Sequence, residues 1–160
     1  GRADYQRNLS VSYIKLGDLM KALGEGEAAR RYYEDSLAIR QRLVQAEPGR
    51  ADYQRDLSVS YERLGDLLGA LGEGEAARRY YEDSLEIAQC LAQAEPVRAD
   101  YQRDVVVSLI RIAAMDSTQA AALLQEALSI LRALKAGACE IPDLDSMIEY
   151  CERRLADKGL

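Results

Sequence analysis

Apolar residues recur every three or four positions along most of the chain, which is the spacing of an amphipathic helix. Gly72-Glu73-Gly74 interrupts one such stripe, as a helix C-cap and tight turn would. A second stripe then runs over 76–94 and stops before Pro96. The pattern predicts two antiparallel helices of about 20 residues joined by a short turn. The first stripe consists of Tyr53, Leu57, Tyr61, Leu64, Leu68 and Leu71.

The chain repeats itself with a period of 48 residues. Residues 1–48 and 49–96 differ at only nine positions: 8, 14, 15, 20, 21, 38, 40, 42 and 44. Self-similarity at a fixed period of about 20 to 50 residues is typical of stacked repeats, in which each unit buries its apolar face only against its neighbours. We therefore expect an all-α solenoid of helix-turn-helix units.

A third copy begins at Val97 and then diverges, with five residues fewer near its turn, where Ser117 is expected to cap the next helix. The pattern over 143–157 predicts a last amphipathic helix that covers the final apolar face. The expected organisation is a single repeat domain over 1–160, with about seven helices. Its parts are repeat 1 (1–48), repeat 2 (49–96), a degenerate repeat 3 (97–141) and a capping helix (142–160).

The repeats resemble the tetratricopeptide repeat (TPR), whose unit has an aromatic residue, Leu-Gly, a large residue, a turn Gly, Ala, an aromatic and Ala at fixed offsets. Where the family has a closing Pro, this chain has Gln41 and Gln89, so it resembles an elongated variant. The matching residues are Tyr13, Leu16-Gly17, Met20, Gly24, Ala29, Tyr33 and Ser36, and Tyr61, Leu64-Gly65, Leu68, Gly72, Ala77, Tyr81 and Ser84.

The resemblance implies a right-handed α-solenoid that acts as a protein-protein interaction scaffold, with a protein or peptide bound on a concave face lined by the first helix of each unit. It also suggests the C-terminal repeat fragment of a larger bacterial multidomain protein, and the absence of an initiator Met fits such a fragment. The candidate contact residues on the matching face are Ile14, Lys15, Asp18, Lys21, Glu62, Arg63, Asp66, Ile110 and Arg111.

Differences between the first two repeats bear on this face. Four of the nine lie on the first helix: Asn8/Asp56, Ile14/Glu62, Lys15/Arg63 and Lys21/Gly69. Either the groove chemistry has been altered on a fixed scaffold, or a solvated face has drifted. Some family members grip a C-terminal carboxylate with Lys and Asn, and this chain has Ile14 or Glu62 and Asp18 or Asp66 at those places. Carboxylates would repel an anionic terminus, so that mode of binding is rejected.

Composition and charge argue against several classes of function. The net charge of -6 argues against nucleic acid, and no apolar stretch is long enough for a membrane span. Because the chain has no His, we expect no zinc site, no cofactor and no enzyme activity. The three Cys are expected to be reduced and mostly buried, as in a cytoplasmic protein.

Several further expectations concern the helix surfaces. Tyr5, Tyr53 and Tyr101 continue the apolar stripe and are expected in the core. Asp4-Arg7, Asp52-Arg55 and Asp100-Arg103 at i,i+3, and Arg30-Glu34 at i,i+4, are expected to be pairs within a helix. Two other functions stay open. The first is a structural spacer, or a solenoid segment that self-associates through the first helix of repeat 1, and the second is a small-molecule pocket.

Overall fold

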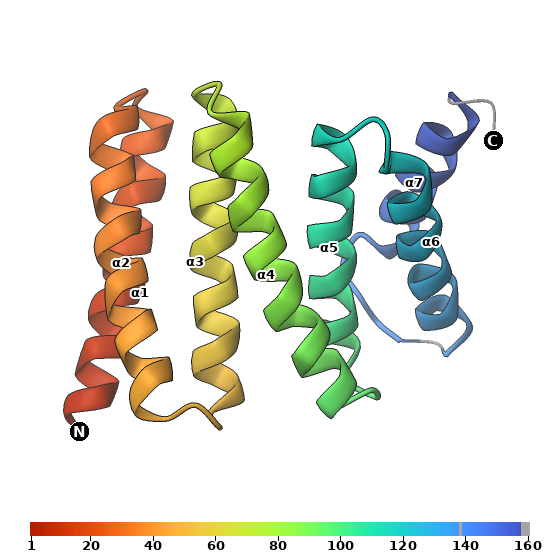
Figure 1. Cartoon of the computed structure of the whole chain (residues 1–160). Helices are drawn as coiled ribbons and strands as arrows, with labels where there is room; N and C mark the ends of the chain where they lie inside the picture. The colour runs from red at the N-terminus through yellow and green to blue at the C-terminus, as the bar shows by residue number, and fades with distance from the viewer. Residues whose placement is uncertain (138, 158–160) are drawn as a thin grey trace. The chain divides into compact units, whose positions relative to one another are not determined.

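The computed structural model describes residues 1–137 and 139–157, and over these ranges it contains seven α-helices and no strand (Figure 1). This confirms the all-α repeat fold. The predicted turns at 24–26 and 72–74, and the predicted end of the second helix before Pro96, also agree with the helix bounds. The helices are α1 (Arg2–Ala22), α2 (Gly26–Ala46), α3 (Ala51–Ala70), α4 (Gly74–Ala94), α5 (Ala99–Met115), α6 (Ala120–Ala136) and α7 (Leu144–Ala156).

The chain forms two compact units, Gly1–Ile87 and Ala88–Leu160. Unit 1 holds α1 to α3 and the first part of α4, whereas unit 2 holds the end of α4 and α5 to α7.

The tight turns of the first two hairpins depend on glycine. Gly24 has φ +78° and Gly72 has φ +83°, a left-handed conformation that residues with a Cβ rarely adopt. In each turn the next amide reaches back into the preceding helix: Glu25 N donates to the Met20 carbonyl at 2.9 Å, and Glu73 N to the Leu68 carbonyl at 2.8 Å. These bonds satisfy carbonyls that the helix end would otherwise leave unpaired.

The third hairpin turns differently. Asp116, not the expected Ser117, organises the start of α6: its Oδ1 accepts hydrogen bonds from Thr118 N at 2.9 Å and from Thr118 Oγ1 at 2.5 Å. An Asp side chain bonds readily to the backbone two residues ahead, so the shortened turn closes without a glycine at positive φ. The prediction of Ser117 as the cap was wrong.

A close approach of helices explains the repeated Leu-Gly motif. A Cβ added to Gly65 would lie 2.5 Å from Tyr81 Cε1, and one added to Gly17 would collide with the ring of Tyr33. In the third repeat, Ala113 stands at the place of Gly65, and Leu124 stands at the place of Tyr81. The third repeat thus has a methyl group in place of the glycine only where a leucine replaces the tyrosine ring. Ala113 and Leu124 are both buried, at 2% and 1% exposure.

Gly65→Ala should therefore destabilise unit 1 by about 2 kcal/mol, because the added methyl overpacks against Tyr81. Gly69→Ala is the matched control. Its Cβ would lie 3.9 Å from the Cβ of Ala77, an ordinary contact, and Ala is the better helix former, so it should stabilise α3 slightly. Urea titration followed by circular dichroism compares the two variants, and equal effects would contradict the packing argument.

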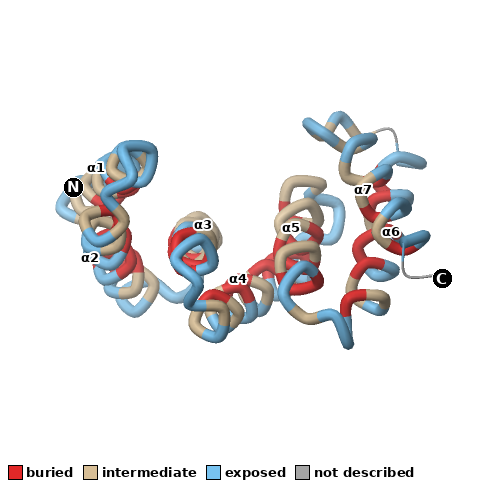
Figure 2. The backbone as a smooth tube through the Cα atoms, turned by 90° about the horizontal axis from the view of Figure 1, so that it is seen from above, coloured by how far each residue is buried: buried red, intermediate tan, exposed pale blue. Residues whose placement is uncertain are grey.

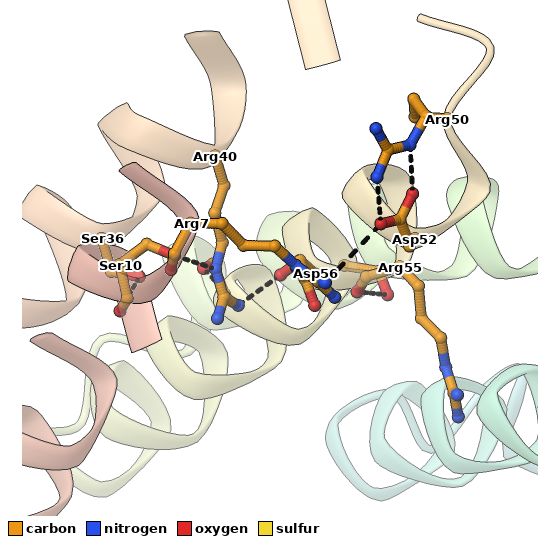
Figure 3. Close-up of polar contacts among 10 residues, drawn as sticks. Arg7, Ser10, Ser36, Arg40, Arg50, Asp52, Arg55 and Asp56 are labelled. Atoms are coloured by element: carbon orange, nitrogen blue, oxygen red, sulfur yellow. Dashed lines mark hydrogen bonds and ion pairs between the residues drawn. The ribbon is translucent and has the colours of Figure 1, made fainter. Parts of the chain in front are cut away.

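A buried arginine lies where α1, α2 and α3 meet (Figure 3). Arg40 is only 4% exposed. Its Nε donates to Ser10 Oγ at 3.1 Å, and its Nη1 donates to Ser60 Oγ at 3.1 Å and to the backbone carbonyl of Asp56. Ser36 Oγ donates to the Ser10 carbonyl at 2.9 Å. Hydrogen bonds thus connect the three helices within the hydrophobic core.

The expected pair Asp4-Arg7 does not hold α1 together. Arg7 instead reaches α3, with its Nε 2.5 Å from Asp56 Oδ2 and its Nη1 3.6 Å from Asp52 Oδ2 (Figure 3). The long side chain of Arg7 reaches α3, so the i,i+3 spacing of Asp4 and Arg7 did not predict the ion pairs that Arg7 makes. The carboxylate of Asp52 also accepts two hydrogen bonds from Arg50, at 2.8 and 2.7 Å. Arg30-Glu34 is confirmed as a helix pair at 3.0 Å.

The thiols are less buried than expected. Cys151 is fully buried in unit 2, and this burial raises the pKa of its thiol. Cys139 is half-buried and Cys90 is exposed, so the expectation of mostly buried thiols was wrong. Cys90 stands at the place of Arg42, which is also exposed and marks this position as a solvent-facing one.

Candidate functional site

In unit 1, α1 and α3 carry six charged candidate residues. Three cations are exposed and three carboxylates are half-buried, which gives a face of mixed charge. Ile14 is only 8% exposed and belongs to the core cluster with Tyr33 and Leu37, so we leave it out of the contact surface. The cations are Lys15, Lys21 and Arg63, and the carboxylates are Asp18, Glu62 and Asp66.

The two aspartates of this face bond to the second helix of their own repeat. Asp18 Oδ1 accepts a hydrogen bond from the Tyr33 hydroxyl at 2.6 Å, and Asp66 Oδ1 accepts one from the Tyr81 hydroxyl at 2.7 Å. Burial, followed by the hydrogen bond to Asp18, raises the pKa of Tyr33 above its usual value. Sequence reasoning missed this role, although Asp and Tyr recur 15 residues apart in both repeats.

One ion pair crosses this face from one repeat to the next. Arg63 Nη1 lies 3.7 Å from Asp18 Oδ1, and both side chains are partly exposed, at 44% and 41%. Exposed pairs of this kind contribute little stability. The guanidinium of Arg63 and the amines of Lys15 and Lys21 are therefore available to a charged partner at small cost to the fold.

Tyr33→Phe should lower the stability of unit 1 by about 1 kcal/mol at neutral pH, because the Asp18 carboxylate loses a donor. Since the folded pKa of Tyr33 is raised, its contribution is present below its ordinary pKa of 10.0 and is lost as the pH rises above that value. The variant should thus show a weaker loss of stability above pH 10 than the native chain. Urea midpoints on both sides of pH 10 measure this, with the exposed Tyr5→Phe as the control, and parallel profiles for both variants would contradict it.

In unit 2, α5 and α7 form a groove of ≈ 300 Å³. Two of the predicted residues, Ile110 and Arg111, lie on its α5 wall beside Val107. The α7 wall is made of Ser146, Met147 and Tyr150, which sequence reasoning did not assign to a site.

The sequence of α7 contained a signal for this second wall. Ile148 and Cys151 are buried, whereas Met147 and Tyr150, one position before each, are half-buried. The apolar face of α7 is therefore wider than contact with a single helix requires. Tyr150 is further held by Arg154, whose Nη1 donates to its hydroxyl at 3.2 Å.

Among residues 1–137 and 139–157, no group of three or more His, Cys, Asp or Glu side chains is placed to hold a metal ion. None of the helices in these ranges combines the length and the apolar character needed to cross a membrane.

Comparison with known protein families gives a match. The family model described as tetratricopeptide repeat matches residues 9–48 and 57–89. No curated protein matches the chain at a significant level. Proteins built from these repeats generally serve as protein-interaction scaffolds, and the family and its all-helical fold are typically non-enzymatic. The matched segments contain both copies of the Leu-Gly motif and of the tyrosine that packs on it. The chain belongs to the tetratricopeptide repeat family.

Proposed function

We propose that this chain is a non-catalytic module that holds an extended segment of a partner protein against the first helices of its repeats. The groove between α5 and α7 carries the proposal: it is open, largely apolar and lined by Ile110 and Met147, with Arg111 at the same wall. Such a groove accepts an apolar side chain of the partner, and the guanidinium favours a carboxylate beside it.

The charged face of unit 1 adds specificity in this proposal. Lys15, Lys21 and Arg63 are exposed, so they attract acidic groups of a partner, while Asp18 and Asp66 disfavour a segment with acidic groups at those places. The proposed partner segment therefore combines acidic and apolar side chains. Origin from a larger bacterial protein of the cytoplasm belongs to the same proposal, and the resemblance of the elongated repeats supports it.

Affinity capture tests the proposal with three forms of the chain. The first is native, and the second carries Ile110→Glu and Arg111→Glu in the groove. The third carries Arg31→Glu and Arg79→Glu, which lie at exposed positions of α2 and α4 and serve as the matched control. Circular dichroism verifies that all three remain helical.

We expect the control to retain a partner that the groove variant loses, because a buried carboxylate in the groove costs more than a charge at an exposed position. Lys15→Glu, Lys21→Glu and Arg63→Glu should then weaken binding of the same partner in a salt-dependent way. If the groove variant captures the same proteins as the native chain, the concave-face proposal is wrong and the spacer function is favoured.

A further inference from the structure

The first helices of the two near-identical repeats carry the same stripe of residues but differ in exposure. Tyr5 is 68% exposed and Tyr53 2%, Leu16 is 38% exposed and Leu64 0%, and Leu19 is 51% exposed and Leu67 2%. Figure 2 shows α3 with many buried positions and α1 with few. We call the exposed part of the stripe on α1 the outer face; it consists of Tyr5, Ser12, Leu16, Leu19 and Leu23. Leu9, also in this stripe, is half-buried against the cluster of Ile39 and Leu43.

The structure shows what covers the equivalent stripe on α3. Helix α2 packs against it, with Ile39 and Leu43 in one buried cluster with Tyr53. Arg40 lies between these two residues in the sequence and donates to Ser60, a member of that stripe. The stripe is thus shaped for the second helix of a repeat hairpin. The outer face of α1 has the same residue as α3 at each of its five positions and therefore offers the same shape.

The outer face differs from the α3 stripe in charge. Asp56, beside the stripe, pairs with Arg7 at 2.5 Å, and the negative charge of its carboxylate also favours the charged form of the buried Arg40. The residue of α1 that corresponds to Asp56 is Asn8, which is neutral. An arginine buried against α1 would lack that negative charge, and a buried charge without a partner is costly. Repeat 2 shows the neutral alternative, since Ala88 replaces Arg40 and is buried at 2% exposure.

We infer that the outer face of α1 docks a partner that brings a helix hairpin of this same repeat type. Its second helix would carry aliphatic residues at the places of Ile39 and Leu43 and an uncharged residue at the place of Arg40. A second copy of this chain fits less well, because apolar residues of its second helices are already buried, including Leu91 and Ala92 on α4. α3 packs on α2, and α7 packs on α6, whose Leu131 and Leu134 are buried.

Adding a hairpin to the full chain tests this inference, because fusion brings it to the face at a high effective concentration. Residues 49–96 are joined ahead of Gly1, which keeps the 48-residue period across the junction. The matched variant carries Ala88→Arg in the added hairpin only. Hydrogen exchange of the α1 amides is measured for both fusions and for the native chain, and sedimentation gives the mass of each.

The neutral hairpin should slow exchange of the α1 amides by about tenfold or more, and the arginine variant should protect them at least about fivefold less. Leu19→Glu in the α1 of the fusion should abolish the protection. Unchanged exchange in the neutral fusion, or equal protection by both hairpins, would overturn the inference. So would a native chain that sediments as a dimer with α1 already protected, since a second copy would then be the occupant.

Discussion

Replacing Arg40 with alanine should lower the free energy of unfolding of the α1–α3 packing by about 3 kcal/mol. The substitution removes the donors that Ser10 Oγ, Ser60 Oγ and the Asp56 carbonyl accept from inside the fold, and it leaves a void in place of a long side chain. Because repeat proteins unfold in parts, hydrogen exchange of the α1 to α3 amides is the direct measurement, with urea titration beside it.

Two further variants separate the causes of that loss. Arg40→Met fills most of the volume without a charge, and because burial already disfavours the charged form and lowers the pKa of Arg40, it should cost within about 1 kcal/mol. Arg42→Ala, at an exposed position two residues further along α2, is the control and should change stability by less than about 0.5 kcal/mol. If Met costs as much as Ala, the loss comes from the missing hydrogen bonds; if neither costs stability, Arg40 does not hold the junction.

Local pattern was enough to predict the helices and turns, because amphipathic spacing, Gly72 and Pro96 act within a few residues. Contacts between repeats were not predictable in the same way. Arg40 and Ala88 occupy the same position in the two repeats and differ greatly in size and in charge, yet both are buried. Only the neighbouring helix, with its Ser60 and Asp56, explains why a guanidinium is stable at that place.

The candidate site shows the same limit. The motif match named Ile110 and Arg111 as contact residues, and the structure has them in the lining of the groove. It named no residue of α7, because this helix has no counterpart in the repeat. The match also named Asp18 as a candidate contact but did not predict that its carboxylate accepts a hydrogen bond from Tyr33 and pairs with Arg63. A residue can match a binding position of the family and still serve the packing of its own repeat.

Tyr53→Ala and Tyr5→Ala should have very different effects although the residues occupy the same position in two near-identical repeats. Tyr53 is 2% exposed, packs with Ile39 and Leu43, and has the Arg50 guanidinium 4.1 Å from its ring centroid. Removing its ring should cost about 3 kcal/mol. Tyr5 is 68% exposed, so its removal should change stability by less than about 0.5 kcal/mol. Urea titration of both variants measures the difference.

This paired comparison cancels the effects that depend on sequence alone. Both substitutions replace Tyr with Ala at the fifth position of the same sequence motif, Gly-Arg-Ala-Asp-Tyr. The gain in helix propensity is therefore the same for each. The remaining difference measures what the preceding helix α2 contributes by covering Tyr53. Equal losses would mean that Tyr5 is covered in solution, whereas a loss confined to Tyr53 would show that the same stripe stabilises the fold only where another helix packs on it.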